Sequence, residues 1–152
     1  MDAIELLKKD HRKVSELFKQ AEAAEGEARK EQLFEKIKTE LETHTHIEET
    51  VFYPALERHE ELKDLVLEAY EEHKQVKTLI REIGQLVEGS EKFDAKLKVM
   101  GENVEHHVGE EEEEMFPKVR KLMSATQLGQ LGKELEEAKQ SFAKSSARST
   151  AR

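Results

Sequence analysis

HTHIEETVFYP, residues 44–54, places two histidines, two glutamates and a proline in one short stretch of a chain rich in Lys, Glu and Leu. In a helix each residue turns by about 100°, so residues three, four, seven or eight positions apart share a face. The neighbours of His44 on such a face are largely apolar: Ile37, Leu41, Ile47, Val51 and Phe52. The neighbours of His46 are polar: Thr39, Glu42, Thr43, Glu49 and Thr50. We therefore expect a helix whose buried face carries His44 and Glu48.

The composition favours a helical protein. Charged residues make up 39% of the 152 residues and aromatic residues 5%, whereas ordinary globular domains contain about 25% charged residues. We expect one all-α domain, because a chain of this length can bury a single core. The net charge of −9 argues against nucleic acid and anionic membranes as partners. Cysteine is absent and no apolar run is long enough for a membrane span, so we expect a cytoplasmic protein.

Apolar residues at helical spacing, interrupted by turn residues, predict four long antiparallel helices. The interruptions fall at Gly26, at Pro54 and in the loop at Ser90. Asp2 and Glu5 have the spacing of a capping box at the start of the first helix. The expected fold is an up-and-down four-helix bundle with helices within residues 1–24, 27–54, 60–89 and 92–123.

A short fifth helix is expected after the bundle. Ser124 with Gln127 three residues later indicates a capping box, and the apolar spacing continues to about Phe142. The last residues are small, polar and basic, which is typical of a disordered tail. The expected organisation is a bundle over residues 1–123, a helix over 124–142 and a disordered basic tail over 143–152.

The chain contains an internal repeat. DHRKVSELF at residues 10–18 matches EHKQVKTLI at 72–80, and HTHIEETVFYP at 44–54 matches HVGEEEEEMFP at 107–117. Both copies of the second segment have a histidine, a pair of glutamates from the fourth position onward and a proline ten positions after the histidine. The two helical hairpins therefore share polar residues, and not only an apolar face.

The same test of helical neighbours separates the other histidines. His11, His73 and His107 lie among apolar residues, whereas His106 lies among Glu102, Asn103, Glu110 and Glu113. The midpoint between His11 and His44 falls beside Gly26, and that between His73 and His107 falls at Ser90. Antiparallel helices joined at those turns would bring six polar side chains to one level of the core: His11, His44, Glu48, His73, His107 and Glu111.

Buried groups of this kind need compensation, because unpaired polar groups in a dry core cost about 2–7 kcal/mol each. A single inward histidine is more often a hydrogen-bonded core residue than a metal ligand. Six such residues in two matching arrays favour metal, and they exceed the four ligands of a tetrahedral zinc site. Helix bundles can hold two metals by inward Glu and His side chains. Nitrogen and oxygen donors suit iron, with manganese, zinc or a mixed pair as alternatives.

The combination of His11, HTHIEETVFYP, EHKQV and HVGEEEEEMFP resembles the hemerythrin-like family, also called HHE cation-binding domains, over about residues 1–123. The resemblance implies a non-heme centre of two iron ions with a bridging oxo, hydroxo or water ligand. Glu48 and Glu111 would bridge the irons. The terminal ligands would be His11, His44, His73 and His107. The implied partner is a small diatomic or peroxide ligand, and whether a protein partner exists stays open.

Two positions depart from the oxygen-carrying members. Lys77 stands where they have a further histidine, and Glu111 follows the last histidine by four positions where they have an aspartate after five. One iron could then hold water or another small ligand. We expect binding of dioxygen or a related oxidant. The alternatives are an enzyme that decomposes peroxide or nitric oxide, and a structural metal or iron-storage protein.

The remaining polar residues of the repeat are interpreted as peripheral. Asp10 and Glu72 precede matching histidines, but adjacent residues on a helix point about 100° apart, so we expect both to be solvated. Tyr53 is about 180° from His44 on an ideal helix and is expected to pack at the helix end. Of the acidic run 110–114, only Glu111 is expected to point inward.

Overall fold

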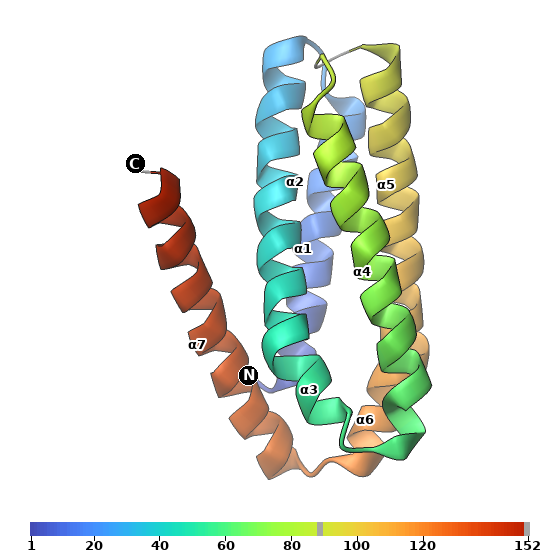
Figure 1. The fold of residues 1–152 in the computed structure, drawn as a ribbon, viewed down its shortest axis with the longest axis vertical. Coiled ribbons are helices and arrows are strands. Elements are labelled where there is room, and N and C mark those ends of the chain that lie inside the picture. Colours follow the sequence, from blue (N-terminus) through green and yellow to red (C-terminus); the bar gives the residue numbers. More distant parts are fainter. Residues whose placement is uncertain (88–89, 151–152) are drawn as a thin grey trace.

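The computed structural model describes residues 1–87 and 90–150. Four antiparallel helices form a bundle, and a fifth lies along its outside (Figure 1). The bundle helices are α1 (Ala3–Ala23), α2 (Glu27–Ile47), α4 (Lys63–Gly84) and α5 (Glu91–Glu110). No strand occurs among the described residues. The predicted up-and-down bundle with a C-terminal fifth helix is confirmed.

Local signals in the sequence explain most helix ends. Asp2 and Glu5 form the predicted capping box of α1, with Glu5 N–H 2.9 Å from Asp2 Oδ1. Gly26 has a φ of 86°, a conformation that glycine adopts without steric cost. Ser90 caps α5 by accepting a hydrogen bond from the Phe93 N–H. The third helix ends at Gly84, before the predicted end at residue 89; residues 88–89 lie outside the described part.

The second and fourth bundle helices each change pitch where the repeated segment lies. α2 passes into a π-helix (Glu48–Phe52) and then α3 (Tyr53–Leu56), while α5 passes into a π-helix (Glu111–Met115) and then α6 (Phe116–Leu122). Pro54 and Pro117 lie in the first turn of α3 and α6. Proline lacks an N–H, and it is tolerated at a helix start. A 3₁₀ turn (Glu60–Leu62) leads from α3 into α4.

The fifth helix, α7, extends over Ala125–Thr150 and packs beside α1 and α2 (Figure 1). Ser124 and Gln127 form the predicted capping box. The prediction that the helix is short and ends near Phe142 was wrong, and residues 143–150 are helical. Those residues include no glycine or proline, so nothing local stops the helix from continuing. Residues 151–152 lie outside the described part.

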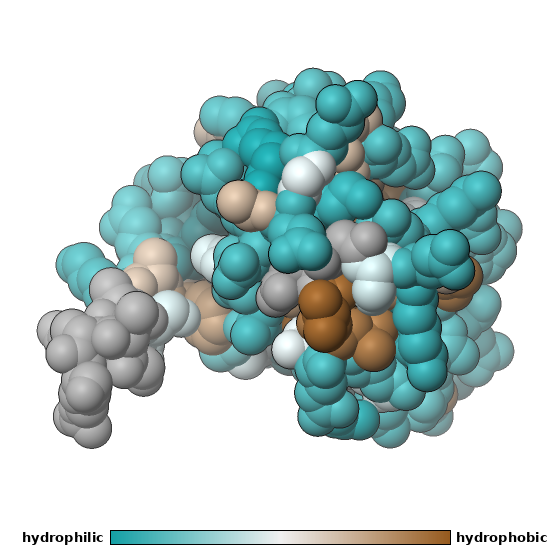
Figure 2. Space-filling view, turned by 90° about the horizontal axis from the view of Figure 1, so that it is seen from above, coloured by the Kyte–Doolittle hydropathy of each residue, from teal (hydrophilic) through white to brown (hydrophobic). Residues whose placement is uncertain are grey.

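Two apolar clusters fill the bundle, one on each side of a polar layer. The cluster near the α3 and α6 end includes Ile4, Leu7, Phe52, Leu56, Phe116 and Leu131. The cluster toward the opposite end includes Val14, Leu33, Ile37, Ile80, Phe93 and Met100. Seen from above, the outer surface is largely hydrophilic with only a small hydrophobic area (Figure 2). No helix in the described part of the chain is long and apolar enough to cross a membrane.

Candidate metal centre

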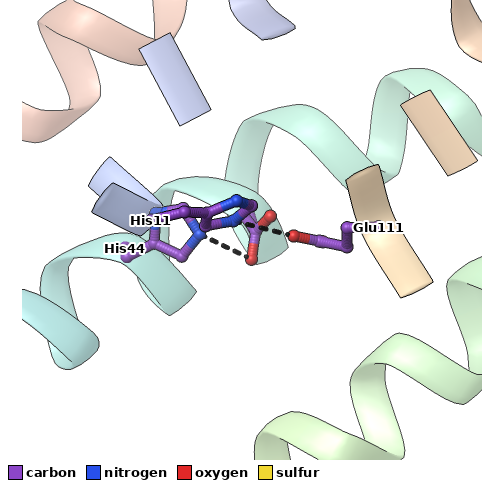
Figure 3. Close-up of side chains that lie close together, drawn as sticks. His11, His44 and Glu111 are labelled. Carbon is purple, nitrogen blue, oxygen red and sulfur yellow. Dashed lines mark ion pairs between the residues drawn. The ribbon is translucent and has the colours of Figure 1, made fainter. Parts of the chain in front are cut away.

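The polar layer consists of the six residues predicted to converge. Every one of them is buried, with exposed fractions of 7% or less: His11, His44, Glu48, His73, His107 and Glu111. Figure 3 shows the imidazoles of His11 and His44 side by side, with Glu111 pointing toward them from another helix. The structure therefore brings all six to one place. Their role as metal ligands stays a prediction.

The Nε2 atoms of the histidines face the two carboxylates. Glu48 Oε1 lies 3.3 Å from His44 Nε2 and 3.1 Å from His73 Nε2. Glu111 Oε1 lies 3.1 Å from His11 Nε2, and Glu111 Oε2 lies 3.4 Å from His107 Nε2. The layer therefore contains two groups of side chains that could each hold a cation. The first consists of His11, His44, Glu48 and Glu111, and the second of Glu48, His73 and His107. Glu48 belongs to both.

Four donor atoms of this layer lack a hydrogen-bond partner among the described residues, although they are buried. They are His11 Nε2, His44 Nε2, Glu48 Oε2 and Glu111 Oε1. Buried polar atoms in native proteins are nearly always paired, and leaving them unpaired costs about 1–3 kcal/mol each. A metal cation would satisfy imidazole nitrogens and carboxylate oxygens together. The donor set therefore fits the metals that the sequence predicts.

Each inward histidine has a second carboxylate at its other ring nitrogen. His44 Nδ1 lies 3.2 Å from Asp10 Oδ2, and His107 Nδ1 lies 2.6 Å from Glu72 Oε1. The prediction that Asp10 and Glu72 are solvated was wrong. The 100° offset between adjacent residues turns each acid away from the histidine that follows it, but toward the histidine of the neighbouring helix.

The second glutamate of each Glu-Glu pair has the same role. Glu49 Oε2 lies 2.7 Å from His73 Nδ1, and Glu112 Oε2 lies 2.6 Å from His11 Nδ1. The prediction that Glu111 alone points inward from the acidic run therefore missed Glu112. A carboxylate can only accept from an imidazole N–H, so Nδ1 carries a proton in each ring. When metal displaces a proton from such a ring, the lone pair that becomes available is therefore on Nε2. This arrangement orients metal-binding histidines in proteins.

Tyr53 also belongs to the layer, which corrects the prediction that it packs at the helix end. It is fully buried, and its hydroxyl donates to Glu111 Oε2. The Tyr53 hydroxyl oxygen also lies 3.3 Å from His73 Nε2. The cause is the π-helix, in which the Tyr53 N–H bonds to the Glu48 carbonyl five residues earlier. The wider turn brings Tyr53 above Glu48, onto the inner face.

Lysine side chains neutralise two of the outer carboxylates. Lys77 Nζ lies 2.9 Å from both carboxylate oxygens of Glu49, and half of its side chain is exposed. Lys139 of α7 donates to Asp10 Oδ1 at 2.5 Å. The Lys77 ammonium therefore pairs outside the inner layer, and α7 is linked to the carboxylate that orients His44.

Charges in the layer stabilise one another. Burial alone would lower the pKa of His44, but the negative charge of Glu48 and the hydrogen bond with Asp10 raise that pKa to about 10. Burial alone would lower the pKa of His107 as well, but the charge of Glu111 and the hydrogen bonds with Glu111, Glu48 and Glu72 together raise it. Burial opposes ionisation of Glu48, yet His44 and the hydrogen bonds from the neighbouring histidines hold its pKa well below the usual range. Imidazolium and carboxylate groups thus compensate one another before metal binds.

These features define a class: antiparallel helix bundles with a buried layer of histidine and carboxylate donors. Residues 2–119 match the hemerythrin HHE cation-binding domain family. The chain belongs to this family, as its sequence motifs predict.

Two known proteins are similar to this chain, one in its solved structure and one in its sequence. A solved structure of a hemerythrin HHE cation-binding domain-containing protein from Mycobacterium kansasii superposes with a TM-score of 0.86 at 23% identity, covering 97% of this chain and 91% of that one. That likeness shows the fold, α7 included. A protein from Nostoc sp. named DNA nickase is 27% identical over 139 residues, which are 91% of this chain. The chain spans only 39% of that relative's length.

Proposed function

We propose that this protein holds two iron ions in the polar layer and binds dioxygen or a related oxidant there. Support comes from two adjacent donor groups that share Glu48, together with the four buried atoms that lack a partner. His11 and His44 would serve one ion and His73 and His107 the other, with Glu48 and Glu111 between them. Iron held by imidazole and carboxylate ligands can exchange electrons and bind small oxygen-containing molecules.

The chain's own residues prepare the site for such a ligand. Four outer carboxylates orient the imidazoles and increase their basicity as donors. The two apolar clusters lie on either side of the layer, so little water can surround a bound molecule. Tyr53 places a hydroxyl beside Glu111, His73 and His107. Its single O–H, which donates to Glu111 here, could turn to donate a hydrogen bond to an oxygen-containing ligand.

Loading with ferrous iron in the absence of air, followed by admission of air, tests this function. We expect about two irons per chain by elemental analysis and a charge-transfer absorption that appears only with air. The His44→Ala and Glu48→Gln variants should lose metal and absorption, whereas His59→Ala, outside the layer, should retain both. Fewer than two metals per chain in the wild type and no spectral response would contradict the proposal.

A second candidate is an enzyme that decomposes peroxide or nitric oxide. The position of Lys77 favours it, since an ammonium paired with Glu49 supplies no ligand to the nearby ion. One coordination position would then be open to substrate. Peroxide and nitric oxide consumption by the iron-loaded wild type and by His44→Ala tests this idea, and equal rates would exclude it. A metal-dependent melting temperature without any response to oxidants would instead favour a structural metal or iron storage.

Action on DNA is not part of the proposed function. The Nostoc relative is named a DNA nickase, but most of that protein's length has no counterpart here. This chain carries a net charge of −9, which repels a polyanion. We further propose a cytoplasmic location, on the same grounds of composition.

A further inference from the structure

A groove of about 400 Å³ between α1 and α5 leads to the polar layer. Its inner wall includes His11 itself, with Val104 and Val108 from α5. Phe18 lies against α5 at Gly101, where an added Cβ would be only 3.2 Å from its Cδ1 atom. The His11 imidazole is buried, and its Nε2 is one of the atoms without a partner. The groove thus ends at a donor of the proposed centre.

The internal repeat supplies a comparison, because a second groove lies at the equivalent place between α2 and α4. Its volume is about 340 Å³. Lys77 and Ile80 line it where Ser15 and Phe18 line the first, and Thr45 occupies the position of Val108. Matching helices therefore create a groove beside each half of the centre.

The second groove is obstructed in ways that the first is not. Phe142 of α7 forms part of its wall and stacks on His46, with ring centroids 4.5 Å apart. The ion pair between Lys77 and Glu49 lines this groove on the side of His73. In the first groove a small side chain, Ser15, takes the place of Lys77, and α7 contributes nothing to the lining.

We propose that the α1/α5 groove is the access route by which small neutral oxidants reach the metal centre, and that Ser15 keeps this route open. The inference rests on the proposed function. The apolar side chains of Phe18, Val104 and Val108 line the groove beside His11, together with exposed charged residues such as Lys19. Apolar side chains next to the centre suit uncharged molecules as small as dioxygen and peroxide. Ser15 is exposed one helical turn after His11, so a large ring at this position would cover the groove without touching the layer.

Azide binding to the ferric protein tests the route when stopped-flow absorption is recorded at mildly acidic pH, where part of the azide is present as neutral hydrazoic acid. In Ser15→Phe we expect the association and dissociation rates to fall together by at least tenfold, with the Kd within twofold of wild type. A blocked route slows passage in both directions, whereas a damaged centre changes the Kd. Glu16→Phe adds the same ring at an adjacent exposed position outside both grooves and should bind azide at wild-type rates.

The second groove supplies the opposite control. Thr50→Phe would fill it, and both azide rates should stay at wild-type values. Each variant must first show the wild-type metal content and melting temperature. Unchanged rates in Ser15→Phe, a changed Kd in that variant, or slowing by Thr50→Phe would each overturn the access route while leaving the metal centre intact. A wild-type protein without two metals or without an azide spectrum would overturn both the centre and the route.

Discussion

At the scale of single residues, the site has an inner set of donors and an outer set of carboxylates that follow different rules. The inner histidines and glutamates lie on the buried face of their own helices, so helical periodicity alone predicts them. The outer carboxylates point sideways and meet histidines of neighbouring helices, as Asp10 meets His44. Their partners are distant in sequence, and only the packing of the helices shows which acid meets which histidine.

Removing one outer carboxylate tests its orienting role. Asp10→Asn and Glu72→Gln keep the size of each side chain but remove the charged acceptor from His44 and His107. We expect the metal affinity to fall about 10–100-fold in each variant, the usual effect of losing such a partner. Competition with a metal indicator dye would measure it. Glu71→Gln, whose carboxylate pairs with Lys74 at the surface, should match wild type, and an unchanged affinity in the first two variants would refute the role.

Protons should compete with metal for the inner histidines. The neighbouring carboxylates raise the pKa values of His44, His73 and His107 above the usual 6.5. The pKa of His44 is raised to about 10, so its imidazole holds a second proton at pH 7 in the metal-free protein. The contribution of the three raised pKa values to stability is complete below pH 6.5, and for His44 it is lost as the pH rises through about 10. Metal must displace the protons, so metal affinity should rise by up to about tenfold per pH unit for each proton displaced.

Proton release provides the measurement for this pH dependence. Zinc added to weakly buffered metal-free protein between pH 6 and 8 should release protons that an indicator dye detects, and the apparent Kd should decrease across the same range. His59 lies outside the inner layer and outside every group of side chains that could hold a cation in the described part of the chain. A His59→Asn variant should therefore release the same number of protons as wild type. Binding without proton release, or with a Kd independent of pH, would contradict the paired charges.

At the scale of elements, the π-helices set the limits of sequence-based prediction. The four bundle helices, their caps and their turns follow from apolar spacing. Tyr53, however, was predicted on the wrong face, because the prediction assumed 100° per residue through Glu48–Phe52, where the structure has a π-turn. The equivalent residue in the other half is Phe116, which stacks parallel to His11 with ring centroids 6.0 Å apart. The Glu-Glu-x-x-x-aromatic-Pro spacing common to both halves is a signal that could have indicated the π-turns.

The position of α7 depends on a glycine. A Cβ added at Gly132 would lie 2.5 Å from the Met1 carbonyl oxygen and 3.0 Å from the Ala3 nitrogen, and both are backbone atoms. Gly132→Ala should force α7 away from the start of α1 and lower the free energy of unfolding by about 1–3 kcal/mol. Gly129 in the same helix has nothing within 4 Å of an added Cβ. Gly129→Ala should therefore raise the free energy of unfolding by up to about 1 kcal/mol. Chemical denaturation would measure both, and equal effects would refute the close contact.

At the scale of the whole molecule, the negative net charge predicts weak association with polyanions. Proteins bind DNA largely because their Lys and Arg side chains neutralise phosphates and release counterions. A chain with a net charge of −9 is expected to gain little from this effect. We expect no detectable binding of the metal-loaded protein to duplex DNA by fluorescence anisotropy at 150 mM salt, and no gain when the salt is lowered to 50 mM. Affinity that rises steeply as salt decreases would show a cationic surface that the net charge conceals, and would contradict this expectation.

Metal should also hold the bundle together as one cooperative unit. The polar layer separates two apolar clusters, and its residues come from α1, α2, α4, α5 and the two π-helices. Bound cations would therefore link all four helices of the bundle. A ligand at 100 times its Kd stabilises the folded state by about 2.7 kcal/mol, and each kcal/mol shifts the melting temperature of a chain of this size by about 2–4 °C. Chelation should therefore lower the melting temperature by about 5–11 °C.

Glu48→Gln, which removes the carboxylate shared by both donor groups, should melt at one temperature with or without metal. A wild-type protein that is insensitive to chelation, or a variant that responds as strongly as wild type, would show that the layer is stabilised by its own ion pairs and not by a cation.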